Sequence, residues 1–195
     1  MAKKSIQTRK AAKNTQSSGT KMYWVIGGGI LAAVAIIGLL YSSLREPAGI
    51  EGIQKFVSPA RDHDNTLVYE GGDKPQPGGS HHDIWQNCGV YTSPINEANA
   101  LHSLEHGAVW ITYNDSLPQD EVQILEQLGR ENSYVLVSPY PTQTSPVVLT
   151  AWATQLETDS AKDSRVAEFV DRYQQGIQTP ERGATCSGGI GSPAN

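Results

Sequence analysis

One uncharged interval, from Met22 to Leu44, limits how the rest of the chain can fold. It reads MYWVIGGGILAAVAIIGLLYSSL, and about 20 apolar residues in a helix are enough to cross the core of a bilayer. Aromatic residues stand near both ends, where they favour the membrane interface. The run is long for the apolar region of a signal peptide, and no clear A-x-A cleavage site follows it. We therefore expect an uncleaved transmembrane anchor at 22–44, with a cleaved signal peptide as the alternative.

The charges on the two sides of this interval are opposite in sign. Six basic residues and no acidic ones precede it, whereas the other nine basic residues and all twenty acidic residues follow it. Basic flanks of membrane helices stay in the cytoplasm. We therefore expect residues 1–21 to form a disordered cytoplasmic tail and the part after the anchor to face the outside of the plasma membrane. The acidic balance of that part argues against nucleic-acid binding.

The pattern beyond the anchor predicts a juxtamembrane spacer at 45–60 and one domain at 61–195. A helix is expected to begin between Ser93 and Asn96 and to end at Gly107, because glycine suits the left-handed residue after a helix. Residue periodicity then predicts a strand at 108–113, a helix at 119–131, strands at 134–137 and 147–152, and a helix at 164–175. This order indicates a single compact α+β domain outside the cytoplasm, with a small β-sheet and flanking helices.

The two cysteines, Cys88 and Cys186, both lie beyond the anchor, where thiols oxidise. We expect a disulfide that ties the C-terminal tail to the middle of the domain. Two free thiols or two soft metal ligands are the alternatives. After Gly176 the tail is rich in glycine, serine and proline, so Cys186 is expected to be its only attachment.

The strongest chemical signal is an H-x-x-E-H motif formed by His102, Glu105 and His106. Histidines four residues apart share one face of a helix and can bind one metal ion, and the same letters form the zinc site of inverted zinc peptidases. The leucines of this helix fall on the opposite side, so another segment must cover the imidazoles. The glycine- and proline-rich run at 71–80 leads directly to His81 and His82, which this loop can carry over the helix.

Three functions fit this motif. In a metal-binding protein, Glu105 orients an imidazole or adds a ligand, and imidazoles with a carboxylate suit zinc or copper(II). Both methionines lie outside the domain, so a thioether copper(I) site is not expected. In a small zinc hydrolase, His81 or Glu181 is the third ligand and Glu105 the general base, although a domain of about 130 residues leaves little room for a substrate cleft. In a non-metal interaction domain, the histidines donate to backbone carbonyls and Glu105 pairs with an arginine. Whether this domain binds a protein partner outside the cytoplasm is left open by the sequence.

The stretch from about 63 to 181 resembles the domain-of-unknown-function 3105 family of bacterial, often membrane-anchored, proteins. The resemblance implies that the domain faces the cell exterior. It also implies that His63 joins His81, His102, Glu105 and His106 in one site. The loop departs from the usual P-P-T-S-G-P-H, reading P-Q-P-G-G-S-H, but keeps its histidine. The residues that carry the resemblance are His81-His82, Trp85, Gly89-Val90-Tyr91, His102 to Tyr113, Leu149 to Trp152 and Pro180-Glu181.

Overall fold

The computed structural model describes Val34, Ile36 and residues 49–57 and 59–194. The chain divides into two compact units, Met1–Ala48 and Gly49–Asn195, and the second unit carries all five histidines and both cysteines. The expected cytoplasmic tail lies outside the described residues, as does the expected anchor apart from Val34 and Ile36. Within the described part of the chain, no helix has the length and apolar character that crossing a membrane requires.

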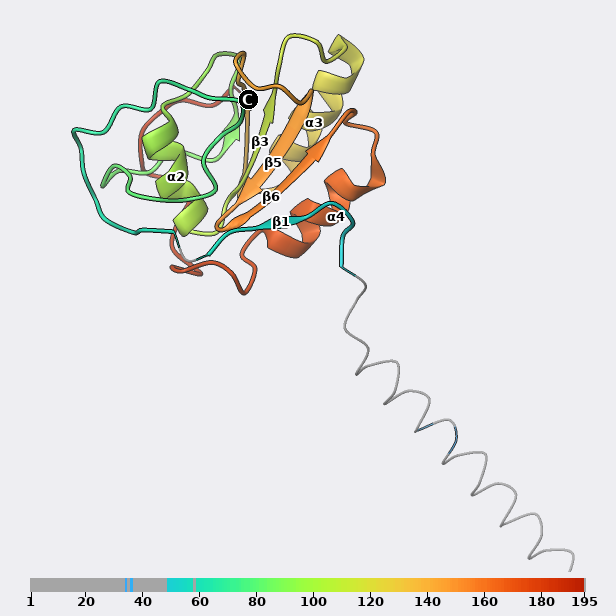
Figure 1. The fold of residues 1–195 in the computed structure, drawn as a ribbon, viewed down its shortest axis with the longest axis horizontal. Coiled ribbons are helices and arrows are strands. Elements are labelled where there is room, and N and C mark those ends of the chain that lie inside the picture. The colour runs from blue at the N-terminus through green and yellow to red at the C-terminus, as the bar shows by residue number, and fades with distance from the viewer. Residues whose placement is uncertain (1–33, 35, 37–48, 58, 195) are drawn as a thin grey trace, which may run out of the picture. The chain divides into compact units, whose positions relative to one another are not determined.

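The second unit is a mixed α+β domain built on one six-stranded sheet with the strand order β1-β6-β5-β3-β4-β2 (Figure 1). The strands β2–β4 and β3–β4 pair in parallel, and the other neighbours are antiparallel. The predicted strands at 108–113, 134–137 and 147–152 are confirmed as β3, β4 and β5, whereas β6 was not predicted. The bounds are β1 Gln54–Lys55, β2 Gly89–Val90, β3 Val109–Tyr113, β4 Val135–Pro139, β5 Val147–Ala151 and β6 Thr154–Thr158.

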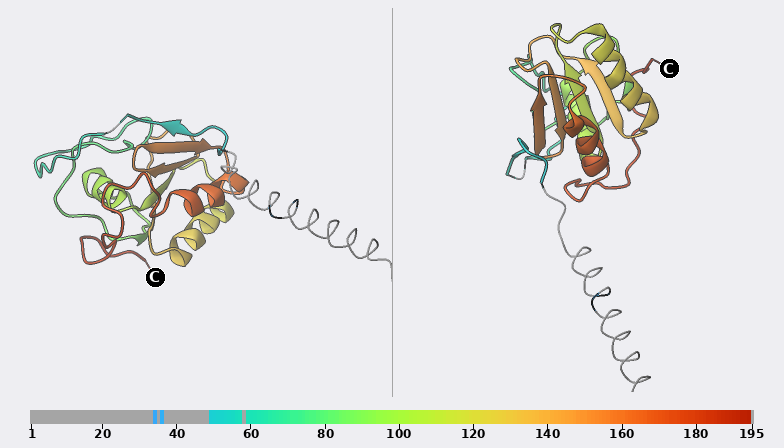
Figure 2. Two further views of the ribbon diagram at one scale, coloured as in Figure 1. Left: turned by 90° about the horizontal axis from the view of Figure 1, so that it is seen from below. Right: turned by 90° about the vertical axis from the view of Figure 1, so that its right-hand side faces the viewer.

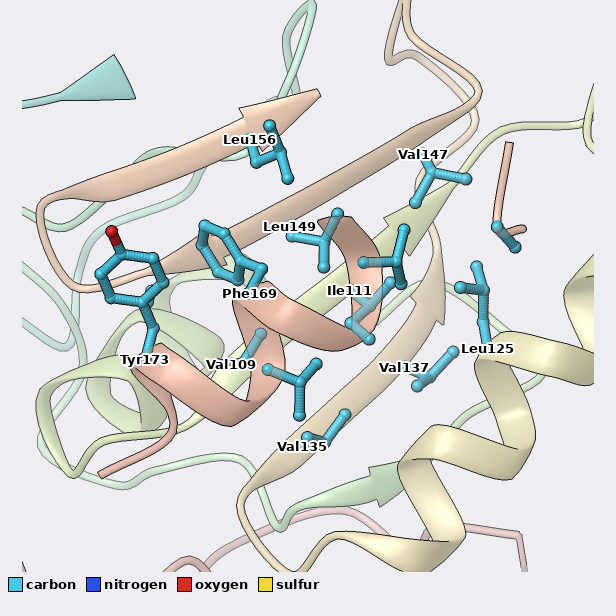
Figure 3. Packing of buried hydrophobic residues seen from close by; sticks show 14 of the residues in the cluster. Val109, Ile111, Leu125, Val135, Val137, Val147, Leu149, Leu156, Phe169 and Tyr173 are labelled. Atoms are coloured by element: carbon cyan, nitrogen blue, oxygen red, sulfur yellow. The ribbon is translucent and has the colours of Figure 1, made fainter. Parts of the chain in front are cut away.

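Helices cover both faces of the sheet (Figure 2). The helices α3 (Gln119–Glu131) and α4 (Ser164–Tyr173) lie on one face, over a cluster that includes Ile111 and Phe169 (Figure 3). The helix α2 (Glu97–Glu105) lies on the other face, where its leucines join Trp110. Neighbouring residues of a strand point to opposite faces, so β3 contributes Ile111 to one cluster and Trp110 to the other. Gly129 of α3 has no side chain to separate the helix from Val137 of β4.

Helix α2 begins and ends where its sequence predicts. The side chain of Asn96 caps it by accepting a hydrogen bond from the Asn99 N–H at 3.2 Å. Gly107 follows its end with a φ of 102°, a left-handed conformation that glycine adopts without strain. Every residue of α2 is buried, on the imidazole face as well as the leucine face. The expected covering segment therefore exists, and it consists of chain from both before and after the helix.

The C-terminal tail has more attachments than predicted. The disulfide between Cys88 and Cys186 is present, as expected. The tail is also held by backbone hydrogen bonds: the Glu181 N–H donates to the Glu105 carbonyl at 3.0 Å, and the Ala194 N–H donates to the Val90 carbonyl at 2.7 Å. The prediction that Cys186 alone holds the tail was wrong, because backbone pairing needs no distinctive side chains and leaves no sequence signal.

Candidate metal centre

Two loop segments and helix α2 bring three imidazoles together. His63 and His81 lie on neighbouring extended segments that form an isolated parallel bridge, and His102 lies on α2. The centroid of each of these three rings is 4.9 Å from the other two. Zinc–nitrogen bonds of about 2.1 Å in tetrahedral geometry place three such ring centroids roughly 5 Å apart. The spacing of the rings therefore fits a shared metal ion.

Ligand atoms of these residues and of Glu105 lie close to one another. One donor atom from each of the four lies within 4.8 Å of all the others, and we call this set the inner group (His63, His81, His102 and Glu105). Tetrahedral donors around zinc lie about 3.4 Å apart, so closing the inner group around an ion needs side-chain shifts on the order of 1 Å. His63 is the exposed member of the group, whereas the other three are buried.

A second set of donors adjoins the first. His102, His106 and Glu181 also place one ligand atom each within 4.8 Å of one another, and we call them the outer group. The rings of His102 and His106 have centroids 4.6 Å apart, and Nε2 of His106 lies 3.6 Å from Oε2 of Glu181. The side chain of Glu181 is 47% exposed, so the outer group reaches solvent.

The backbone fixes which ring nitrogen can bind a metal. The Nδ1 atoms of His81, His102 and His106 each lie 2.7 Å from a carbonyl oxygen, that of Gly79, His82 and Thr185 respectively. A carbonyl oxygen only accepts hydrogen bonds, so each Nδ1 carries a proton and each Nε2 keeps its lone pair. Metal-ligating histidines commonly donate their other ring N–H in this way, which orients the ring. The non-metal interpretation predicted bonds to carbonyls too, but these bonds leave the Nε2 atoms free.

Electrostatics keep His102 neutral. Burial lowers its pKa to about 4, and the neighbouring rings of His106, His81 and His63 contribute in the same direction, against the hydrogen bond to the His82 carbonyl. The ring is therefore uncharged at neutral pH, which is the form that binds metals.

Nε2 of His81 faces a carboxylate oxygen of Glu105 without making a hydrogen bond to it. Nε2 of His81 is buried without a hydrogen-bond partner, although Oε2 of Glu105 lies 2.9 Å away. With the proton of His81 on Nδ1, both of these atoms are acceptors and repel one another. A proton on Nε2 or a metal ion between the two atoms removes the repulsion, so this buried contact is compatible with a bound cation.

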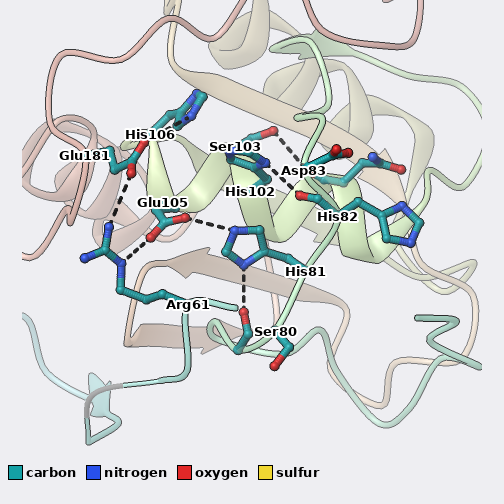
Figure 4. Close-up of polar contacts among 12 residues, drawn as sticks. Arg61, Ser80, His81, His82, Asp83, His102, Ser103, Glu105, His106 and Glu181 are labelled. Atoms are coloured by element: carbon teal, nitrogen blue, oxygen red, sulfur yellow. Dashed lines mark hydrogen bonds and ion pairs between the residues drawn. The ribbon is translucent and has the colours of Figure 1, made fainter. Parts of the chain in front are cut away.

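Arg61 neutralises part of the acidic charge. Its Nε atom contacts Oε1 of Glu105, and its Nη2 atom lies 3.4 Å from Oε1 of Glu181 (Figure 4). Sequence reasoning anticipated an arginine beside Glu105 only in the non-metal interpretation and did not identify Arg61. The residue stands two positions before His63, and this proximity is the only sequence signal that points to it.

His82 is placed apart from the other histidines. Its Nε2 lies 2.9 Å from the Leu67 carbonyl, and neither ligand group among the described residues includes it. Its backbone carbonyl nevertheless orients His102. The indole ring of Trp85 packs beside the outer group, with its centroid 4.9 Å from that of the His106 ring. The ring of Trp152 makes a T-shaped contact with that of His81, with the two centroids 5.9 Å apart. Trp152 belongs to the hydrophobic cluster that contains Trp110 and the leucines of α2.

Comparison with models of known protein families identifies the family of this chain. The model of a family described as a protein of unknown function, DUF3105, matches residues 60–188. No curated protein and no solved structure matches the chain. The matched span holds every member of the inner and outer groups, together with Arg61 and both cysteines. The chain therefore belongs to the DUF3105 family.

Proposed function

We propose that this protein binds one divalent transition-metal ion, zinc(II) or copper(II), in a domain tethered to the outside of the plasma membrane. The observation that carries the proposal is the triangle of imidazoles of His63, His81 and His102, closed by the Glu105 carboxylate. Imidazole with carboxylate suits both metals, and copper(II) binds more tightly than zinc at equal geometry. A copper(II) d–d absorption band distinguishes the two after loading.

The proposed location rests on the sequence and on the disulfide. A bridge between Cys88 and Cys186 persists in oxidising compartments, and the exterior of the cell is one of them. The uncharged run at 22–44, with basic residues before it, supports a single N-terminal anchor that leaves the domain outside. The proposed role is therefore to capture a metal ion on the exterior side of the membrane or to hand one on.

The contacts of Glu105 support binding over hydrolysis. A general base in a zinc hydrolase needs a carboxylate oxygen directed at the metal-bound water. Here Oε1 of Glu105 contacts Arg61, Oε2 faces Nε2 of His81 at 2.9 Å, and the side chain is only 2% exposed, so neither oxygen faces open space for a water molecule. A carboxylate in these surroundings serves as a ligand or holds a ligand in place.

His63→Ala is the most direct test, because His63 is exposed and its removal leaves no cavity in the core. The full-length chain, purified in mild detergent, is loaded with zinc or copper(II), and affinity is measured by competition with a chelator. We expect His63→Ala to weaken binding by about 10-fold or more, since loss of one ligand or its support costs at least that much.

His82→Ala is the matched control. It also removes one imidazole, from the segment that pairs with that of His63, but it leaves the backbone carbonyl that orients His102 in place. Its metal affinity should equal that of the wild type. Equal affinities for all three proteins, with unchanged melting temperatures, would refute the proposed site.

A further inference from the structure

The inner and outer groups share His102, which lies within reach of two adjoining ion positions. Its Nδ1 donates a proton to the His82 carbonyl, so Nε2 holds its only available lone pair. One lone pair binds one ion. The two groups therefore cannot both be complete at the same time, and they are alternative positions for a single ion.

Each position has one exposed member, His63 in the inner group and Glu181 in the outer group, and the other donors of both groups are buried. The two exposed members differ in chemistry, because Glu181 is a carboxylate and its side chain is 47% exposed, whereas His63 is an imidazole. A carboxylate attracts a cation from solvent more strongly than an imidazole does. The outer group is thus the entry end of a short path, and His102 stands at the junction.

We infer that an ion is captured by the outer group and passed by His102 to the inner group, a step that rests on the metal binding proposed above. The bonds from the ion to His106 and Glu181 break and bonds to His63, His81 and Glu105 form, while the Nε2 bond of His102 persists. The step exchanges ligands without any change in oxidation state, and any proton held between His81 and Glu105 leaves to solvent when the ion arrives. The ion keeps a protein ligand throughout.

Arg61 provides the compensating movement of charge. It contacts Glu105 and is also 3.4 Å from Glu181. When the ion reaches the inner group, its positive charge replaces that of Arg61 beside Glu105. The guanidinium can then pair fully with the Glu181 carboxylate that the ion has left. Each carboxylate therefore has a cation at both ends of the transfer, which avoids an unpaired buried charge.

The stoichiometry of the wild-type chain is the first test. The full-length protein in detergent is equilibrated with excess zinc, freed of unbound ion, and its zinc content is measured by mass spectrometry. We expect one zinc ion per chain, because His102 supplies one lone pair. Two ions per chain would show that the groups fill independently and would overturn the transfer.

The kinetic test uses Glu181→Gln, which keeps the backbone bond to Glu105 and removes the surface carboxylate. Zinc uptake and zinc release to the chelator 4-(2-pyridylazo)resorcinol are followed by stopped flow. A side chain that contacts the ion only in transit lowers the barrier to uptake and to release by the same amount. We therefore expect both rates to fall by about 10-fold in this variant, with little change in affinity. Unchanged rates, or a faster release that weakens affinity, would overturn the inference.

Glu131→Gln is the matched control, since it removes one exposed carboxylate from α3 and changes the net charge by the same amount. Its rates should match those of the wild type, and an equal slowing in this variant would count against a specific role for Glu181. A wild-type chain that retains no zinc would instead refute the proposed function itself. The two failures are therefore distinguishable.

Discussion

At the scale of single residues, the site depends on imidazoles that are buried, neutral and oriented by the backbone. The carbonyl oxygens of Gly79, His82 and Thr185 fix three rings, because each accepts the Nδ1 proton. Burial then lowers the pKa of His102, which disfavours protonation of its Nε2. A neutral ring leaves the lone pair of Nε2 available, which favours metal binding. It also makes the metal-free site sensitive to acid.

We predict that the metal-free protein loses stability as the pH falls from about 6.5 to about 4. The pKa of His102 is about 4 in the folded state against an ordinary value of 6.5, so the unfolded chain takes up the proton first. The contribution of His102 is fully present above pH 6.5 and is lost below pH 4. It amounts to at most about 3.5 kcal/mol, at roughly 1.4 kcal/mol for each pH unit.

The measurement is urea unfolding across this pH range in the presence of a chelator. His102→Asn removes the titrating ring, so its stability should depend less steeply on pH than that of the wild type. Identical pH dependences for the two proteins would contradict the assignment.

At the scale of elements, helix α2 is defined by its two ends. Asn96 begins it with a side-chain cap, and Gly107 reverses the chain into β3. A short helix with these fixed ends presents His102, Glu105 and His106 with a defined rotation about its axis. The two histidines therefore reach the adjoining groups and the leucines reach the sheet.

Gly107→Ala should destabilise the fold by about 1–3 kcal/mol, measured as the free energy of unfolding. The residue has a φ of 102°, and an added Cβ would collide with the Gln175 amide and lie 3.1 Å from Cγ2 of Thr179. Gly183→Ala is the control, because its φ is 93° and nothing lies within 4 Å of its added Cβ. If both variants lose the same stability, crowding at Gly107 plays no part.

At the scale of the whole molecule, the C-terminal tail completes a site that begins more than a hundred residues earlier. Glu181 places a candidate ligand atom in the outer group, and the Thr185 carbonyl orients His106. The next residue, Cys186, is bonded to Cys88 at a sequence separation of 98. The disulfide therefore couples the outer group to the middle of the domain.

Replacing both cysteines by serine should lower the free energy of unfolding by about 4–5 kcal/mol, because a cross-link that closes a loop of this length restricts the unfolded chain by that amount. The same variant should release zinc with altered kinetics, since the tail that holds His106 and Glu181 loses its covalent attachment. Chemical denaturation and stopped flow check the two effects. A loss of stability with unchanged zinc kinetics would show that hydrogen bonds alone position the tail.

The sequence by itself determined the elements whose residue pattern repeats. The helix at 119–131 matches α3 in full, and β3 and β5 agree to within one residue at each end. The strand β6 was missed because the turn before it contains Ala153 with a φ of 55°, where a glycine or asparagine would have given a signal. The short strands β1 and β2 contain two residues each, too few for any periodicity.

The sequence also determined the chemistry of the site, because the H-x-x-E-H spacing puts His102 and His106 on one helical face whatever the rest of the chain does. Only the tertiary structure decided which other groups meet them. It separated His82 from the other histidines, placed Arg61 beside Glu105, and brought Glu181 next to His106. These placements depend on the path of loops and tail through space, and residues joined by backbone pairing over such separations share no local pattern.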